Sequence, residues 1–145
     1  MLTVTKSADF NPKLEVAGCF CEFDGKFLLL KREEEDPHDS KLGLPGGKLD
    51  KGETKEQAII RETLEESGID ISKSIKFIKT TYVRYPEGDF IYHVFHAKLN
   101  NKPSVVISLE HSAYVWATPK EALEMDCMED LYVCMNMVYP QTVGK

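Results

Sequence analysis

Residues 45–69 read Pro45-Gly-Gly-Lys-Leu-Asp-Lys-Gly-Glu-Thr-Lys-Glu-Gln-Ala-Ile-Ile-Arg-Glu-Thr-Leu-Glu-Glu-Ser-Gly-Ile69. The stretch divides into a glycine-rich loop and one short helix. Thr54 followed three residues later by Gln57 fits a capping box, and Gly68 fits a left-handed helix cap. The two signals predict a helix over Lys55–Ser67. We expect the rest of the chain to be organised around this loop and helix.

The predicted helix has two different faces on a helical wheel. The expected packing face consists of Ile60, Thr63, Leu64 and Ser67, and the opposite, acidic face of Glu62, Glu65 and Glu66. Like charges at these spacings destabilise a helix by about 0.2–0.5 kcal/mol per pair. No lysine lies on that face, but Mg²⁺ takes carboxylate oxygens and would relieve the repulsion. The alternative is a solvated charged face; the adjoining glycine loop, whose backbone can come close to a ligand, favours the metal site.

The stretch also resembles the signature of the Nudix hydrolases. Gly47 is followed by five residues, Glu53, seven residues, and then Arg-Glu-Thr-Leu-Glu-Glu-Ser-Gly-Ile over residues 61–69. Thr63 departs from the family, which usually has an aliphatic residue there, and Leu42 stands where many relatives have tryptophan. The resemblance implies an α/β fold, the α/β/α sandwich with a mixed β-sheet.

The resemblance implies roles for individual residues. The candidate catalytic residues are Glu53, Arg61, Glu62, Glu65, Glu66 and Glu110, and the candidate ligands of Mg²⁺, or of Mn²⁺ as a substitute, are Gly46 (through its carbonyl), Glu62, Glu65, Glu66 and Glu110. Glu53 is either a ligand or the ion-pair partner of Arg61, or simply a first-turn carboxylate favoured by the helix dipole. The general base is left open between a helix glutamate and Glu110.

The substrate is less well defined by the sequence. The resemblance makes Arg32, at the end of a predicted strand, a candidate phosphate contact, and the alternative is a solvated strand end. Tyr85 is a candidate nucleotide contact. In the family, a tyrosine downstream of the signature is associated with dinucleoside polyphosphates and a proline with ADP-ribose, and Tyr85-Pro86 supplies both. The aromatic residues Tyr82, Tyr85, Phe90 and Trp116 could stack on a base or belong to the core.

The resulting functional hypothesis is a Mg²⁺-dependent pyrophosphohydrolase acting on a nucleoside triphosphate, oxidised or not, or on a dinucleoside polyphosphate. The alternatives are an ADP-ribose or nucleotide-sugar pyrophosphatase and a non-catalytic nucleotide-sensing module. The diphosphate isomerases of the same fold are disfavoured, because no cysteine stands in a recognisable catalytic context.

Composition limits the remaining possibilities. A chain of 145 residues with 42% hydrophobic residues is expected to form a single domain over 1–145. A net charge of −6 without a basic stripe argues against a nucleic-acid polymer as partner. The absence of a signal-peptide core or of 18 consecutive apolar residues predicts a cytoplasmic protein without a membrane partner. A homodimer is an open expectation, since dimers occur among Nudix relatives.

Hydrophobic patterns predict the other elements. The expected strands are 14–23, Lys26–Arg32, Ile75–Tyr85, 90–99 and 112–117. Helices are expected from Thr118-Pro119 and over 128–139, the latter with a core stripe of Met128, Leu131, Met135 and Val138. Residues 1–13 are expected to be irregular, and 33–40 to form a polar loop that could rim the site. Cys19 and Cys21 are expected in the core, and no disulfide is predicted.

Overall fold

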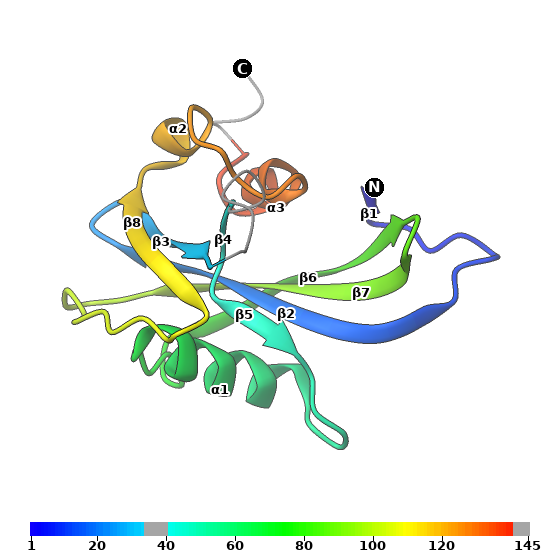
Figure 1. The fold of residues 1–145 in the computed structure, drawn as a ribbon, viewed down its shortest axis with the longest axis horizontal. Coiled ribbons are helices and arrows are strands. Elements are labelled where there is room, and N and C mark those ends of the chain that lie inside the picture. The colour runs from blue at the N-terminus through cyan, green and yellow to red at the C-terminus, as the bar shows by residue number, and fades with distance from the viewer. Residues whose placement is uncertain (34–40, 141–145) are drawn as a thin grey trace.

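The computed structural model, which describes residues 1–33 and 41–140, consists of a mixed β-sheet with helices on both faces (Figure 1). The strands are β1 (Leu2–Thr3), β2 (Pro12–Phe23), β3 (Lys26–Arg32), β4 (Leu42–Gly43), β5 (Gly46–Lys48), β6 (Ile75–Tyr85), β7 (Gly88–Lys98) and β8 (His111–Ala117). The helices are α1 (Lys55–Ser67), α2 (Pro119–Ala122) and α3 (Leu131–Val138). Figure 1 shows α1 on one side of the sheet and α2 and α3 on the other.

The sheet has the order β1-β6-β7-β2-β3-β4, with β5 paired to β2 and β8 paired to β3. The long pairing of β2 with β7 is parallel, whereas the other strand pairs are antiparallel. β2 and β3 pair only next to their hairpin turn and then separate. Because β5 takes the place of β3 beside the middle of β2, the glycine loop lies against the centre of the sheet.

Side chains alternate between two hydrophobic clusters. On β3, Phe27 and Leu29 belong to the cluster that contains Met135 of α3, while Leu28 and Leu30 belong to the cluster around Ile59 of α1. Both faces of the sheet are therefore buried, which explains the apolar character of its central strands on both sides. The predicted α/β/α sandwich with a mixed sheet is confirmed.

Helix α1 has the predicted ends but not the predicted packing face. Thr54 and Gln57 form both hydrogen bonds of a capping box, and Gly68 ends the helix in the left-handed conformation at φ 76°. Leu64, however, is 50% exposed, whereas Glu66 is only 7% exposed. The buried face is rotated by about a quarter of a turn from the prediction. Two contacts account for this difference. Ala58 and Ile59 pack towards the sheet, and residues 104–108 cover the end of the helix with two amides that donate to the backbone carbonyls of Glu66 and Ser67.

Several element boundaries also differ. Residues 1–13 are not wholly irregular, because β1 pairs with β6 and β2 already begins at Pro12. β7 begins at Gly88, β8 at His111 and α3 at Leu131; Met128, expected in the core, is 54% exposed. Most of the loop predicted for 33–40 falls at 34–40, outside the described residues.

The described cysteines are free and buried, including Cys19 and Cys21, as predicted. No helix in the described ranges has the length and apolar character needed to cross a membrane.

Candidate active site

The glycine loop touches the acidic side of α1 without intervening side chains. The Gly46 amide donates a hydrogen bond of 2.8 Å to Oε1 of Glu66. A Cβ atom added to Gly46 would lie 2.0 Å from the carbonyl oxygen of Ala17, and one added to Gly47 would lie 2.5 Å from Cδ of Glu62. Two consecutive residues without Cβ atoms therefore allow the backbone to reach both carboxylates.

Arg61 connects most of the other charged residues of the stretch. Its Nε and one terminal nitrogen donate to the two oxygens of Glu53 at 2.8 and 3.0 Å. The other terminal nitrogen donates to Glu62 at 2.9 Å and to Glu65 at 3.3 Å, and the backbone carbonyl of Lys48 accepts a further hydrogen bond. The Arg61 guanidinium, with the Asp50 amide, lowers the pKa of Glu53 to about 2, and Glu53 in turn raises the pKa of Arg61. Glu53 thus has the geometry of an ion-pair partner of Arg61.

Glu62 and Glu66 lack full compensation of their charge. Burial and the nearby Glu62 and Glu110 carboxylates together raise the pKa of Glu66 to about 7, although the Gly46 amide lowers it. Burial likewise raises the pKa of Glu62, although Arg61 opposes the change. Because Glu62 and Glu110 both raise the pKa of Glu66, this part of the site carries excess negative charge.

These residues fit a hard divalent cation. Within residues 1–33 and 41–140, no group of three or more acidic, histidine or cysteine side chains converges on one point. Mg²⁺ does not need such a group, because it is usually held by one or two carboxylates, waters and substrate phosphates. Glu62 and Glu66, with the glycine backbone between them and the sheet, provide a donor set of this kind.

A cavity of about 370 Å³ opens beside Glu66. Its lining includes Gly46, Gly47 and Glu66 and apolar residues such as Leu2, Val83 and Phe90. Its cationic residues are Arg32, Lys41 and Lys48. Tyr85 also lines it, and the Tyr85 hydroxyl donates a short hydrogen bond to Oδ2 of Asp130. The size and the mainly apolar lining are typical of a small-molecule site.

The structure brings most of the predicted site residues together. Arg61 joins Glu53, Glu62 and Glu65 in one network, and Gly46 is hydrogen-bonded to the neighbouring Glu66. Arg32 and Tyr85 line the adjoining cavity. The exposed Glu110 acts on the pKa of Glu62 and Glu66, and its carbonyl accepts a hydrogen bond from the Glu33 amide.

The other aromatic candidates divide between core and cavity. Trp116 packs against the cluster on the α1 side, and Tyr82 makes an edge contact with Phe10. Phe90 alone of these lines the cavity with Tyr85.

Sequence reasoning missed Lys41, His111 and Asp130, which also line the cavity. No motif marks any of them. Lys41 follows the acidic loop, His111 follows Glu110, and Asp130 lies inside a segment predicted as continuous helix, so only the fold brings them to one place.

Comparison with known proteins identifies the family. The NUDIX domain model matches residues 12–133, which include the glycine loop, α1 and most of the residues that line the cavity. The chain belongs to the Nudix family. It is 31% identical over 112 residues to the CTP pyrophosphohydrolase of Escherichia coli, covering 77% of this chain and 80% of that protein. It is also 40% identical over 86 residues to the ADP-ribose pyrophosphatase of Methanocaldococcus jannaschii, covering 59% of this chain and only 50% of that protein.

Solved structures agree with the Nudix fold. The MutT protein from Methanosarcina mazei superimposes with a TM-score of 0.78 at 24% identity, covering 93% of this chain and 98% of that one. The family match and the named relatives make this chain a Nudix hydrolase.

Proposed function

We propose that this Nudix hydrolase is a Mg²⁺-dependent pyrophosphohydrolase that cleaves a phosphoanhydride bond of a nucleoside triphosphate. The observation that carries the proposal is the position of Glu66. Its carboxylate is buried, lies beside Glu62, lines the cavity and accepts a hydrogen bond from the Gly46 amide. A buried carboxylate with so little compensation is expected at a functional site rather than in a structural ion pair.

Glu62 and Glu66 would hold the metal, with the Gly46 carbonyl, Glu65 and Glu110 as further ligand candidates. Bound Mg²⁺ supplies charge compensation for phosphoryl oxygens and a lower pKa for a coordinated water. The chain's own contribution is to hold the carboxylates in place. Arg61 fixes Glu62 from one side, and the Gly46 amide fixes Glu66 from the other.

The cavity lining supports a nucleotide as substrate. Arg32 and Lys41 offer cationic groups for a polyphosphate, and the apolar residues offer a surface for a base. Arg32 also acts on the charge of Glu66, which puts it within electrostatic range of the carboxylates. A small-molecule nucleotide therefore matches both the cationic and the apolar residues of the lining.

The triphosphate is favoured over ADP-ribose by the extent of similarity. The relative named as a CTP pyrophosphohydrolase is matched over most of its length, whereas the relative named as an ADP-ribose pyrophosphatase is matched over half. A nucleotide-sensing module is disfavoured because such modules often lose signature carboxylates, and this chain retains Glu62, Glu65 and Glu66.

We propose Glu110 as the general base, because its exposed side chain acts on both Glu62 and Glu66 and is hydrogen-bonded to no described residue. Glu65 is the alternative, but Arg61 contacts both of its oxygens. Glu110→Gln should lower kcat without weakening metal binding. An unchanged kcat would assign the role of general base to a glutamate of the helix.

Product analysis tests the proposal. The purified protein would be incubated with Mg²⁺ or with EDTA and with nucleoside triphosphates, oxidised nucleoside triphosphates, diadenosine polyphosphates, ADP-ribose and nucleotide sugars. We expect release of pyrophosphate from a triphosphate only with Mg²⁺ and not by Glu66→Gln. Cleavage of ADP-ribose alone would replace the substrate class, and nucleotide binding without any turnover would favour the sensing module.

A further inference from the structure

An irregularity in the pairing of β3 with β8 brings His111 to the cavity. Lys31 pairs with Ala113, but the next residue of β3, Arg32, pairs with His111, so that Ser112 is an extra residue between them. Such a bulge shifts the alternation of side chains along a strand, which otherwise has a period of two. His111 therefore takes the place beside Arg32 that Ser112 would have in a regular ladder.

His111 and Arg32 lie on the face of the sheet that borders the cavity. Leu30, two residues before Arg32 on β3, lines the cavity, as do Arg32 and His111 themselves. The Cβ atoms of directly paired residues in an antiparallel ladder are about 4.5–5.5 Å apart. Glu66 of the proposed metal site belongs to the same lining. A ligand whose phosphates lie between Glu66 and Arg32 would therefore have His111 as a neighbour.

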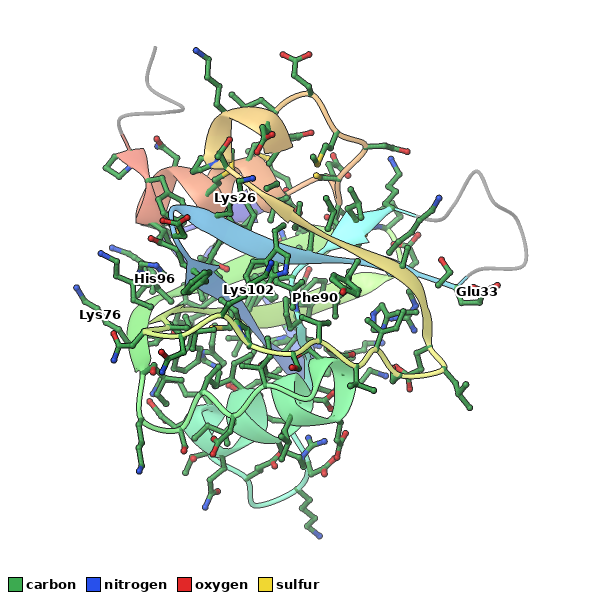
Figure 2. All side chains as sticks on the ribbon, turned by 90° about the vertical axis from the view of Figure 1, so that its left-hand side faces the viewer. Lys26, Glu33, Lys76, Phe90, His96 and Lys102 are labelled. Atoms are coloured by element: carbon green, nitrogen blue, oxygen red, sulfur yellow. The ribbon has the colours of Figure 1, made fainter. Side chains whose placement is uncertain are left out.

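The turn before β8 fixes the backbone at His111. The His111 amide donates to the carbonyl of Ser108 at 3.1 Å, and the Ser108 amide donates to the carbonyl of Glu66 at 3.2 Å. At the end of β3, the Glu33 amide donates to the carbonyl of Glu110 at 2.8 Å, and Figure 2 shows Glu33 near the start of β8. The turn is thus hydrogen-bonded both to β3 and to the helix that carries Glu66.

The imidazole ring of His111 is hydrogen-bonded at one nitrogen only. Nδ1 lies 3.3 Å from Oγ of Ser108, whereas Nε2 has no hydrogen-bond partner among residues 1–33 and 41–140. When the Ser108 hydroxyl donates to Nδ1, the neutral ring carries its proton on Nε2, and a protonated ring has a proton there as well. The ring is partly buried and lines the cavity, so an acceptor on a ligand can use this N–H group.

A phosphate group suits the pair formed by Arg32 and His111. A guanidinium binds phosphate through parallel N–H bonds, and an imidazole adds one further N–H donor. Each phosphoryl oxygen can accept more than one hydrogen bond, so one phosphate group can contact both side chains. Lys41 and Lys48 add positive charge elsewhere in the lining.

We propose that His111 is a substrate-binding residue that donates a hydrogen bond from Nε2 to a phosphate group of the substrate. The inference rests on the proposed function, because it requires a substrate whose phosphates lie near Glu66. It extends the phosphate-binding side of the cavity from Arg32 on β3 to the neighbouring strand β8. The contact contributes to affinity whichever base the substrate carries.

Calorimetric titration with an uncleavable substrate analogue tests the inference without turnover. The probe is α,β-methylene CTP, in which a methylene group replaces the oxygen of the bond that would be cleaved, added in the presence of Mg²⁺. We expect His111→Asn to raise its Kd at least about tenfold, the scale of one hydrogen bond to a charged group.

Two further variants serve as matched controls. His111→Gln should raise the Kd by less than about threefold, because the longer side chain can place its N–H group near the position of Nε2, whereas asparagine reaches only that of Nδ1. His96→Asn makes the same change at a ring that is hydrogen-bonded to Glu22 and does not line the cavity. Figure 2 shows His96 on the opposite side of the view from Glu33, and this variant should bind as the wild-type protein does.

An unchanged Kd in His111→Asn would overturn the inference. Equal weakening in His111→Asn and His111→Gln would also overturn it, because the effect would then come from the turn rather than from the Nε2 donor. The same holds for no measurable binding of the analogue to the wild-type protein. Failure of the proposed function looks different: binding of the analogue would still depend on His111 while no triphosphate is hydrolysed.

Discussion

Glu53 and Glu66 belong to the same stretch of chain but have opposite environments. Glu53 receives both hydrogen bonds of the Arg61 fork and one from the Asp50 amide, and its pKa falls to about 2. Glu66 is buried with one amide donor and two acidic neighbours, and its pKa rises to about 7. Glu53 is paired with an arginine, whereas Glu66 has no ion pair with a described lysine or arginine.

The difference separates structural from chemical roles among residues of one type. A carboxylate that the fold fully compensates has little to offer a cation. A buried carboxylate that the fold leaves uncompensated gains most from one. We therefore assign the Glu53–Arg61 pair to holding the loop and helix together, and Glu66 with Glu62 to the chemistry.

Removing the charge at Glu66 should have the largest effect. Glu66→Gln is expected to lower turnover by at least about a hundredfold, the scale seen when charge stabilisation at a reacting group is lost. Its stability should not fall, because a buried charge is removed. Steady-state kinetics of Glu66→Gln would be compared with those of Glu56→Gln. Glu56 is a suitable control because it lies on the same helix and pairs with Lys55. Near-normal turnover of Glu66→Gln would remove Glu66 from the chemistry.

The metal-free protein should become less stable as pH rises. Glu66 binds its proton more tightly in the folded state, with a pKa of about 7 against 4.5 as its ordinary value, so its contribution is complete below the lower pKa and is lost on approaching the higher one. The expected loss over this range is about 3 kcal/mol, because one pKa unit corresponds to about 1.4 kcal/mol. Urea unfolding in EDTA at several pH values should show this slope in the wild-type protein and a flatter one in Glu66→Gln. Equal slopes would mean that Glu66 is ionised in the fold as readily as in the unfolded chain.

Changing the fork at Arg61 should affect both stability and activity. Arg61→Lys loses the paired contact with Glu53 and is expected to lower stability by about 1–2 kcal/mol and turnover roughly tenfold, because Glu62 loses its anchor. Arg84→Lys is the matched control, since Arg84 makes a similar fork with Asp89 away from the cavity. That variant should lose stability but keep turnover. If both variants keep turnover, Arg61 does not position the site.

Replacing Thr63 should change stability by the smallest amount and should not change activity. Its hydroxyl is fully buried and is the one buried side-chain polar atom without a hydrogen-bond partner in the described part of the chain. Thr63→Val should raise the free energy of unfolding by about 1 kcal/mol, because a methyl group replaces an unpaired hydroxyl. Denaturant unfolding checks the sign, and a destabilised Thr63→Val would show that the hydroxyl has a partner.

The sequence predicted the structure best where a feature depends on residues close together in the chain. The caps of α1 depend on Thr54, Gln57 and Gly68 within one segment, and the family signature lies in the same segment, so the helix and the acidic cluster could be predicted together. The strands Lys26–Arg32 and Ile75–Tyr85 were predicted at the observed boundaries, because their apolar and turn residues are also local signals.

Features that depend on distant contacts could not be predicted in this way. The buried face of α1 is set by the sheet and by the chain at residues 104–108, so the helical wheel placed Leu64 inside and Glu66 outside, the reverse of what the fold does. β1 and β5 are short strands that exist through their partners. Asp130 and Tyr85 meet across 45 positions of sequence, and no local pattern indicates that contact.

Binding of Mn²⁺, measured by electron paramagnetic resonance without substrate, tests the central claim most directly. If Glu66 is the carboxylate that the fold leaves for a cation, Glu66→Gln should weaken binding by at least about tenfold, since it removes a charged ligand. Glu56→Gln should bind as the wild-type protein does. Equal binding by wild-type and Glu66→Gln proteins would contradict the account, because the buried charge would then have no role in holding the metal.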